Sequence, residues 1–164
     1  MANTEIVDIV DEDNSVVGSA SVAEAHDKRL LHRVVGVFVF DIGGSLYLQT
    51  SNKYGRLDLS VGGHVQQGET YEEAARREML EEIGLKVPIQ HVVTFLPANA
   101  KLGHYWGLFT ATAPEGWQFE ATEEVSSLSR FDIDAIKQKM KSNPNTFTHG
   151  SMNVMTELIR VKNL

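Results

Sequence analysis

The 164-residue sequence contains no cysteine. The protein therefore has no disulfide framework, no thiolate metal site and no thiol nucleophile. Basic residues are also fewer than acidic residues. The sequence has 15 Lys and Arg residues and 22 Asp and Glu residues, which gives a formal net charge of −7. Proteins that bind nucleic acid non-specifically need a basic face for the phosphates, so we expect no stable nucleic-acid partner.

Long hydrophobic runs are absent as well. No apolar stretch approaches about 18 residues, so we expect no transmembrane helix and no membrane partner. The first residues, MANTEIVDIVDED, are acidic and lack the basic and apolar regions of a signal peptide, which favours a cytoplasmic protein. With 42% hydrophobic and 23% charged residues, the composition is typical of a globular protein. The length predicts one domain over residues 1–164.

Runs of β-branched and aromatic residues alternate with helical segments. We expect a β-hairpin over about residues 5–22, with DEDNS as its turn, and a buried central strand at Arg33–Phe40. Further strands are expected at residues 46–50, 57–61, 89–96, 104–113, 119–122 and 125–131, and helices at about 70–83, 133–141 and 151–161. The segment 23–31 is expected to hold a short helical turn. This alternation predicts an α/β fold with a mixed sheet layered by helices.

The chain is organised around Gly63–Leu85, GHVQQGETYEEAARREMLEEIGL. Gly62 and Gly63 predict a tight turn that can approach a ligand closely. Thr70–Glu73 has the spacing of a capping box at the start of a helix, and Gly84 is placed to end that helix as its C-cap.

Three carboxylates on this helix, Glu78, Glu81 and Glu82, stand at positions i, i+3 and i+4. Helical geometry puts such residues on one face, where they repel each other unless a cation lies among them. Magnesium prefers a few carboxylates together with substrate phosphates, so the pattern predicts a magnesium site that handles a phosphorylated substrate. The alternative is a solvated helix face, because glutamate is a good helix former. The glycine pair and the short, glycine-ended helix favour the metal site.

The same stretch resembles the Nudix box, G-x5-E-x7-R-E-U-x-E-E-x-G-U, where U is a bulky aliphatic residue. All nine defined positions are filled, which makes a chance match very improbable. They are Gly63, Glu69, Arg77, Glu78, Met79, Glu81, Glu82, Gly84 and Leu85. The resemblance implies an α/β/α sandwich with a mixed sheet. It also implies an enzyme that uses Mg²⁺ or Mn²⁺ to hydrolyse the diphosphate linkage of a small, nucleotide-like substrate in which the diphosphate is joined to a moiety X.

The resemblance also implies roles for individual residues. Arg77 is expected to orient a box glutamate, and Glu69 to be structural or to support the ligands. Glu124, in a loop after the box, is a candidate general base, with an ordinary loop glutamate as the alternative. The expected metal ligands are Glu78, Glu81, Glu82 and the Gly62 carbonyl.

The flanking segments VDEDNSVVG, LLHRVVGVFVFD and LQTSNK are similar to the start of type I isopentenyl-diphosphate isomerases, which share the Nudix fold. That family carries a catalytic cysteine at the position that Gly62 fills here. Its divalent site uses histidines and late glutamates; His32 and His64 match two of the histidines, and Glu124 matches one of the glutamates. His26 lies near a third histidine position but is displaced by one residue. The scaffold therefore resembles the isomerases, whereas the intact box is that of a hydrolase.

Several side chains outside the box have two interpretations. His32 and His64 are candidate substrate-binding residues, and the alternative for each is a structural histidine. Lys53 is a candidate phosphate-binding residue or a solvated lysine. We expect His91, His104 and His149 to be structural or exposed. Aromatic residues that could either stack on a nucleobase or fill the core are Tyr54, Phe95, Tyr105, Trp106 and Trp117.

Three function classes are compatible with these features. A Nudix pyrophosphohydrolase is favoured, an isomerase of the isopentenyl-diphosphate type is opposed by the missing cysteine, and a non-catalytic Nudix-fold binding module is opposed by the intact glutamates. The sequence specifies neither the moiety X nor the oligomeric state.

Overall fold

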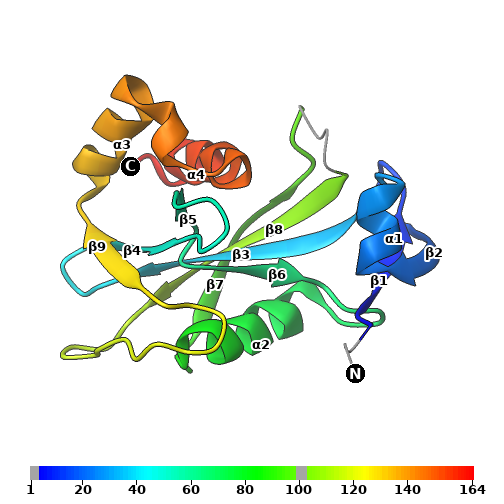
Figure 1. Ribbon diagram of the computed structural model, residues 1–164, viewed down its shortest axis with the longest axis horizontal. Coiled ribbons are helices and arrows are strands. Elements are labelled where there is room, and N and C mark those ends of the chain that lie inside the picture. The colour runs from blue at the N-terminus through cyan, green and yellow to red at the C-terminus, as the bar shows by residue number, and fades with distance from the viewer. Residues whose placement is uncertain (1–3, 99–102) are drawn as a thin grey trace.

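Strand β3 (His32–Phe40) lies at the centre of the sheet in the computed structural model, which describes residues 4–98 and 103–164. It runs parallel to β8 (His104–Thr112) along its whole length and antiparallel to β6 (Val61–His64). Both faces of β3 are covered by other elements (Figure 1), as its nearly continuous apolar sequence predicts.

The remaining strands extend the sheet on both sides of this centre. β1 (Ile6–Val10) and β2 (Val16–Ser21) form the expected antiparallel hairpin. On the other side β4 (Leu46–Thr50) pairs with β5 (Leu57–Asp58) and with β9 (Leu128–Phe131). β7 (Ile89–Phe95) pairs antiparallel with β8. Within the described residues the sheet has nine strands with both orientations, which confirms the mixed α/β fold.

Helices cover the sheet on two sides (Figure 1). α2 (Tyr71–Ile83) packs through Ala75 and Met79 on one face, against side chains such as Val37 of β3. α3 (Ile133–Ser142) and α4 (His149–Lys162) cover the opposite face, where Phe38 packs with Leu158. Because successive side chains of a strand point to opposite faces, β3 contributes to both cores, and the result is an α/β/α sandwich. α1 (Val22–Asp27) lies beside the N-terminal hairpin.

Three expectations about the strands were imprecise or wrong. The expected strand 57–61 is two short strands, β5 and β6, separated by Leu59 and Ser60. Residues 119–122 form no strand, and the strand expected at 125–131 begins only at Leu128. Thr122 instead donates its hydroxyl hydrogen to the Glu82 carbonyl and accepts from the Val125 amide, so this segment is held to the end of α2 rather than to a neighbouring strand. Among the described residues, no helix is long and apolar enough to cross a membrane.

Candidate functional site

Helix α2 begins and ends as the sequence predicts. The Thr70 hydroxyl accepts from the Glu73 amide, and the Glu73 carboxylate accepts from the Thr70 amide, which completes the capping box. At the other end Gly84 has φ +64°, the left-handed conformation that glycine adopts without steric cost. These caps fix the register of the helix and therefore the direction in which its carboxylates point.

A cluster of carboxylates forms where α2 meets β6. Oxygen atoms of Glu78, Glu82 and Glu124 lie within 4.8 Å of one another. Burial raises the pKa of Glu78 to about 7, although the Arg77 guanidinium acts in the opposite direction. Burial likewise raises the pKa of Glu82 to about 8, and the charges of Glu78 and Glu124 add to this effect. A divalent cation among these oxygens would favour the ionised carboxylates, so the donor set fits a hard oxygen-seeking ion such as Mg²⁺.

Arg77 connects the loop before α2 to the carboxylate cluster. Its Nε and Nη2 donate to the two oxygens of Glu69, each at 2.9 Å, which is a bidentate ion pair. Its Nη1 donates to Glu78 Oε1 at 2.8 Å, and Nη2 also donates to the His64 carbonyl at 2.9 Å. The guanidinium thus ties Glu78 to both the loop and β6. This arrangement agrees with the expected orienting role of Arg77 and supporting role of Glu69.

Glu81 lies outside the carboxylate cluster, although it was expected among the metal ligands. Its side chain is about half exposed and accepts from Arg77 Nη1 at 3.2 Å. The helix face is turned so that Glu78 and Glu82 point inward while Glu81 stays at the rim. The third carboxylate is supplied instead by Glu124, from the loop before β9.

The glycine pair that was expected to form a tight turn lies in strand β6. Gly63 and Gly62 pair with Val35 and Gly36 of β3. The Gly62 amide donates to Glu82 Oε2 at 3.2 Å, and the same oxygen accepts from Gln49 Nε2 at 3.1 Å. The backbone of this strand therefore positions the Glu82 carboxylate. The turn of the box lies later, at Gly68, where φ is +77°.

Four histidines form a second cluster: His26, His32, His64 and His104 each place a ring nitrogen within 4.8 Å of the others. Strand register explains three of them, because His32 pairs with His104 across β3 and β8, and His64 pairs with Val34 two residues along. All three side chains therefore point to the same face of the sheet. His26 reaches them from α1. His104 was expected to be structural or exposed, and no local motif marks it; only the parallel register of β3 and β8 brings it here.

The histidines are held in an environment that disfavours the charged ring. Burial lowers the pKa of His64 to about 4 and that of His104 to about 3, and the neighbouring imidazoles add to the effect. Burial also lowers the pKa of His32, whose ring is completely inaccessible to solvent. His32 is buried beneath the cavity lining in this conformation, and its expected substrate contact stays a prediction. His64, which is partly accessible, remains available for such a contact.

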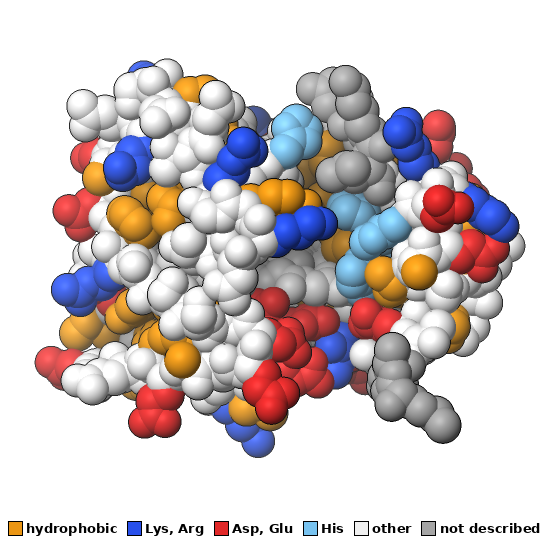
Figure 2. Space-filling view, viewed as in Figure 1, with side chains coloured by type: hydrophobic (Ala, Val, Ile, Leu, Met, Phe, Trp, Pro, Cys, Tyr) orange, Lys and Arg blue, Asp and Glu red, His pale blue; other side chains and the backbone are white. Residues whose placement is uncertain are grey.

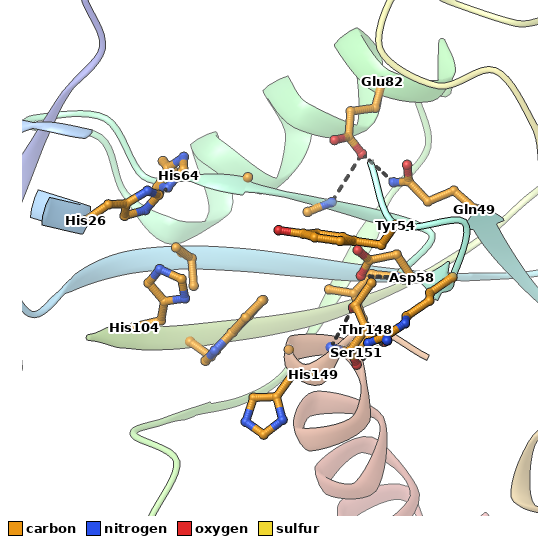
Figure 3. Close-up of a pocket in the computed structure, with 17 residues that line it drawn as sticks. His26, Gln49, Tyr54, Asp58, His64, Glu82, His104, Thr148, His149 and Ser151 are labelled. Carbon is orange, nitrogen blue, oxygen red and sulfur yellow. Dashed lines mark hydrogen bonds between the residues drawn. The ribbon is translucent and has the colours of Figure 1, made fainter. Parts of the chain in front are cut away.

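The two clusters border one cavity of about 590 Å³. In Figure 2 histidine side chains lie along one side of a central hollow, and acidic side chains gather below it. Figure 3 shows His26, His64 and His104 on one side of the cavity, with Glu82, Tyr54 and Asp58 across from them. Other lining residues that can contact a ligand are Arg56, Trp106, His149 and Ser151. A cavity of this size suits a small molecule.

Arg56 lines this cavity, whereas Lys53 is not among the lining residues, and its expected contact with a phosphate stays a prediction. Lys53 is exposed, and its ammonium lies 4.9 Å above the Tyr54 ring. Of the five aromatic candidates, Tyr54 and Trp106 line the cavity. Phe95 and Trp117 pack instead against the two hydrophobic cores.

Comparison with known proteins places these features in a family. The NUDIX domain family matches residues 30–149, which cover most of the chain. An isopentenyl-diphosphate Delta-isomerase of Serratia proteamaculans is 34% identical over 94% of this chain and 91% of its own length. The uncharacterized Nudix hydrolase YfcD of Escherichia coli K12 is 33% identical over 82% of this chain and 79% of its own length.

The fold has a matching solved structure, DR0079 from Deinococcus radiodurans. It aligns with a TM-score of 0.78 at 26% identity and covers 95% of this chain and 97% of that protein. The match spans the N-terminal hairpin and the C-terminal helices as well as the box. This protein belongs to the Nudix family, in a branch that also contains proteins similar to isopentenyl-diphosphate isomerases.

Proposed function

We propose that this protein is a Mg²⁺- or Mn²⁺-dependent pyrophosphohydrolase that cleaves the diphosphate linkage of a nucleoside diphosphate-type substrate. The observation that carries the proposal is the convergence of Glu78, Glu82 and Glu124 within 4.8 Å beside a cavity of small-molecule size. Two of these carboxylates are buried and have raised pKa values, a combination that is common at functional sites.

Each residue has a proposed role in the reaction. Glu78 and Glu82 hold the cation, to which the Gly62 carbonyl is a further candidate ligand, and Arg77 fixes the orientation of Glu78. A divalent cation bound there would neutralise charge on the phosphoryl oxygens and make an attacking water more acidic. The exposed Glu124 carboxylate would accept the proton of a water as its oxygen bonds to phosphorus and the bridging oxygen of the diphosphate leaves. Glu124 is the proposed base because its side chain is the solvent-accessible member of the cluster.

The organic moiety of the substrate is assigned to the far part of the cavity. Tyr54 and Trp106 offer aromatic surfaces on which a nucleobase can stack, and Arg56 offers a guanidinium for a phosphate. Asp58 is largely buried, which raises its pKa, and its Oδ1 accepts from the Leu59 amide at 2.8 Å. These groups support a nucleotide-like substrate rather than a purely aliphatic diphosphate.

A screen of diphosphate compounds tests the proposal. Nucleoside di- and triphosphates, nucleotide sugars, dinucleoside polyphosphates and isopentenyl diphosphate are incubated with the enzyme, and phosphate products are measured with Mg²⁺ or with a chelator. We expect hydrolysis of at least one nucleotide that vanishes with the chelator. Full activity in metal-free buffer would exclude the mechanism, and tight substrate binding without turnover would favour a non-catalytic binding module.

Variants of helix α2 link the activity to the carboxylate cluster. Glu78→Gln and Glu82→Gln retain the size and helix propensity of glutamate and remove one charge. We expect kcat to fall by about two orders of magnitude or more, while the circular dichroism spectrum stays unchanged. Glu72→Gln is the matched control, because Glu72 is an exposed partner of Arg76 on the same helix. Equal kcat values for all three variants would show that these glutamates do not hold the catalytic metal.

A further inference from the structure

Asp58 is an acidic residue of the cavity wall that lies outside the carboxylate cluster. It is the last residue of the short strand β5. Figure 3 shows its side chain between Tyr54 and Thr148, in the part of the cavity assigned above to the organic moiety of the substrate. The reaction proposed above needs no acidic group at this place, so the role of Asp58 requires a separate explanation.

The Asp58 carboxyl is held in a fixed position. Its Oδ1 accepts from the Leu59 amide at 2.8 Å. Strand β5 is itself fastened to the start of α4, because the Leu57 carbonyl accepts from the Thr148 amide at 2.9 Å and from the Ser151 hydroxyl at 3.3 Å. A group that is positioned before the ligand arrives can select the ligand by hydrogen-bond geometry.

The charge of Asp58 is not neutralised by the protein. Burial is the largest influence on the pKa of this carboxyl and raises it, while hydrogen bonds from the Leu59 amide and the Thr148 side chain act in the opposite direction. Within the described part of the chain, no charged side chain is among these influences. A partly buried carboxylate without an ionic partner is stabilised by further hydrogen-bond donors, which a ligand in the cavity can supply.

The sign of this charge determines which part of a substrate faces Asp58. An anionic phosphate is repelled by a carboxylate, so the diphosphate belongs beside the carboxylate cluster and its cation, and the organic moiety belongs beside Asp58. Tyr54 and Trp106 line the same cavity and offer aromatic surfaces for a planar base. The edge of a base stacked there can then meet the carboxylate.

An ionised carboxylate only accepts hydrogen bonds, and this separates the nucleobases into two classes. Cytosine, adenine and guanine each carry an exocyclic amino group, which donates. Uracil and thymine carry carbonyl oxygens instead, and these only accept. A uracil oxygen facing Asp58 would leave both groups unpaired and desolvated, whereas an amino group would satisfy the carboxylate.

We propose that Asp58 determines substrate specificity by accepting a hydrogen bond from an exocyclic amino group of the nucleobase. The protein then selects cytosine, adenine and guanine nucleotides over those of uracil and thymine. This inference rests on the proposed function and adds to it the class of base. A site built to accept from a substrate N–H rejects an analogue without that donor more strongly than an apolar pocket rejects a small change in size.

Hydrolysis rates with matched substrates test the inference. The values of kcat/KM are measured for the di- and triphosphates of all five bases, in ribose and 2′-deoxyribose forms where both exist. We expect the amino-bearing bases to be preferred about 10- to 100-fold, the discrimination typical of specific base contacts. In Asp58→Asn the side-chain oxygen still accepts from the Leu59 amide, while the new NH₂ group can donate to a carbonyl. The preference should therefore fall at least about 10-fold, through a higher KM for amino-bearing nucleotides at nearly constant kcat.

The control is Asp134→Asn, which removes the same charge from an almost fully exposed side chain on α3 and should keep the wild-type preference. Melting temperatures show whether Asp58→Asn is folded. If it is not, Asp58→Glu is the second variant, because it keeps the charge and moves the oxygens by one methylene group. It should reduce the preference for amino-bearing bases while uridine nucleotides gain nothing.

Binding of the non-hydrolysable α,β-methylene analogues of CDP and UDP, measured by calorimetry, requires no turnover. Tighter binding of the cytidine analogue that is lost in Asp58→Asn would support the inference even if the wild type hydrolysed no nucleotide, an outcome that would refute the proposed function alone. Hydrolysis without preference among bases, or the same preference in Asp58→Asn, would overturn the inference and leave the hydrolase assignment intact. A preference for ribose over 2′-deoxyribose alone would assign the contact to a sugar hydroxyl and also overturn it. Absence of binding by every nucleotide would overturn both.

Discussion

The Glu78 carboxylate lies so close to the Gly63 backbone that a side chain at position 63 would clash with it. A Cβ atom at position 63 would lie 2.1 Å from Glu78 Cδ and 2.2 Å from Oε1. Glu78 cannot easily move aside, because Arg77 Nη1 donates to the same Oε1 at 2.8 Å. Gly63, the first glycine of the box, is therefore required because helix α2 approaches strand β6 closely. Its backbone angles would be accessible to other residues.

Gly63→Ala is expected to displace Glu78 and so to lower kcat by about 100-fold, a loss comparable to removal of one transition-state contact. The forced repacking should also cost about 1–3 kcal/mol in the free energy of unfolding. Gly18→Ala is the control, since a Cβ at that exposed strand position meets nothing within 4 Å. Activity assays and urea unfolding of both variants check this prediction. An active, fully stable Gly63→Ala protein would contradict the geometry.

Arg77→Lys should lower activity about 10- to 100-fold, a loss typical when a group that orients a metal ligand is removed. Lysine retains the charge but cannot form the two parallel hydrogen bonds to Glu69 while also contacting Glu78 and the His64 carbonyl. The neighbouring Arg76→Lys is the control, because Arg76 pairs with Glu72 in solvent, where such pairs contribute about 0–1 kcal/mol. Steady-state kinetics of both variants, with metal titrations, separate the two outcomes. If Arg77→Lys and Arg76→Lys lost equal activity, the positive charge at position 77 alone would matter, and not the geometry of its hydrogen bonds.

Glu78 and Glu82 should make the metal-free protein less stable as the pH rises from about 4.5 to about 8. Glu78 and Glu82 have folded-state pKa values of about 7 and about 8, above those of the unfolded chain. In this range the folded state binds more protons than the unfolded state, so the free energy of unfolding falls as these carboxyls ionise. Glu82→Gln should flatten the dependence, and so should added Mg²⁺. Thermal melts across the pH range measure both effects, and an unchanged slope in Glu82→Gln would refute the assignment.

The histidines act in the opposite direction at lower pH. The pKa values of His64 and His104, about 4 and about 3, lie below that of an unfolded histidine. Between these values and about 6.5 the unfolded state binds more protons at these two histidines, so their contribution to stability rises with pH and opposes that of Glu78 and Glu82 above about 4.5. The two contributions oppose each other between about pH 4.5 and 6.5, and the carboxyl contribution alone continues above that, so the metal-free protein is expected to lose stability most clearly above about pH 6.5. A melting temperature that falls steadily from pH 4 to pH 7 would contradict this balance.

Local patterns in the sequence predicted the box helix and its immediate partners well. Thr70, Glu73 and Gly84 act within one helix, so their spacing suffices to predict its ends. His104 could not be found in this way, because its place beside His32 depends on the parallel pairing of β3 and β8, more than 70 residues apart in the chain. The same limit applies to Glu81, whose separation from Glu78 and Glu82 depends on how α2 is rotated against the sheet. Spacing identifies a helix face, whereas packing decides which of its residues are buried.

The wild-type protein is expected not to convert isopentenyl diphosphate to its allylic isomer, despite its similarity to the Serratia isomerase. The resemblance to that family places Gly62 where a catalytic cysteine stands, and glycine can neither donate nor accept a proton. Steric exclusion is not the reason, because a Cβ at position 62 would meet Leu59 Cδ1 at an ordinary 3.5 Å. Gly62→Cys should therefore fold with a melting temperature close to that of the wild type, and this variant shows whether the thiol alone is missing. Product chromatography with isopentenyl diphosphate measures both proteins. Turnover by the wild type would contradict the hydrolase assignment, because a chain without cysteine would then have to move the proton with another group. The candidates are His64, which lines the cavity, and Glu124, which lies in the carboxylate cluster.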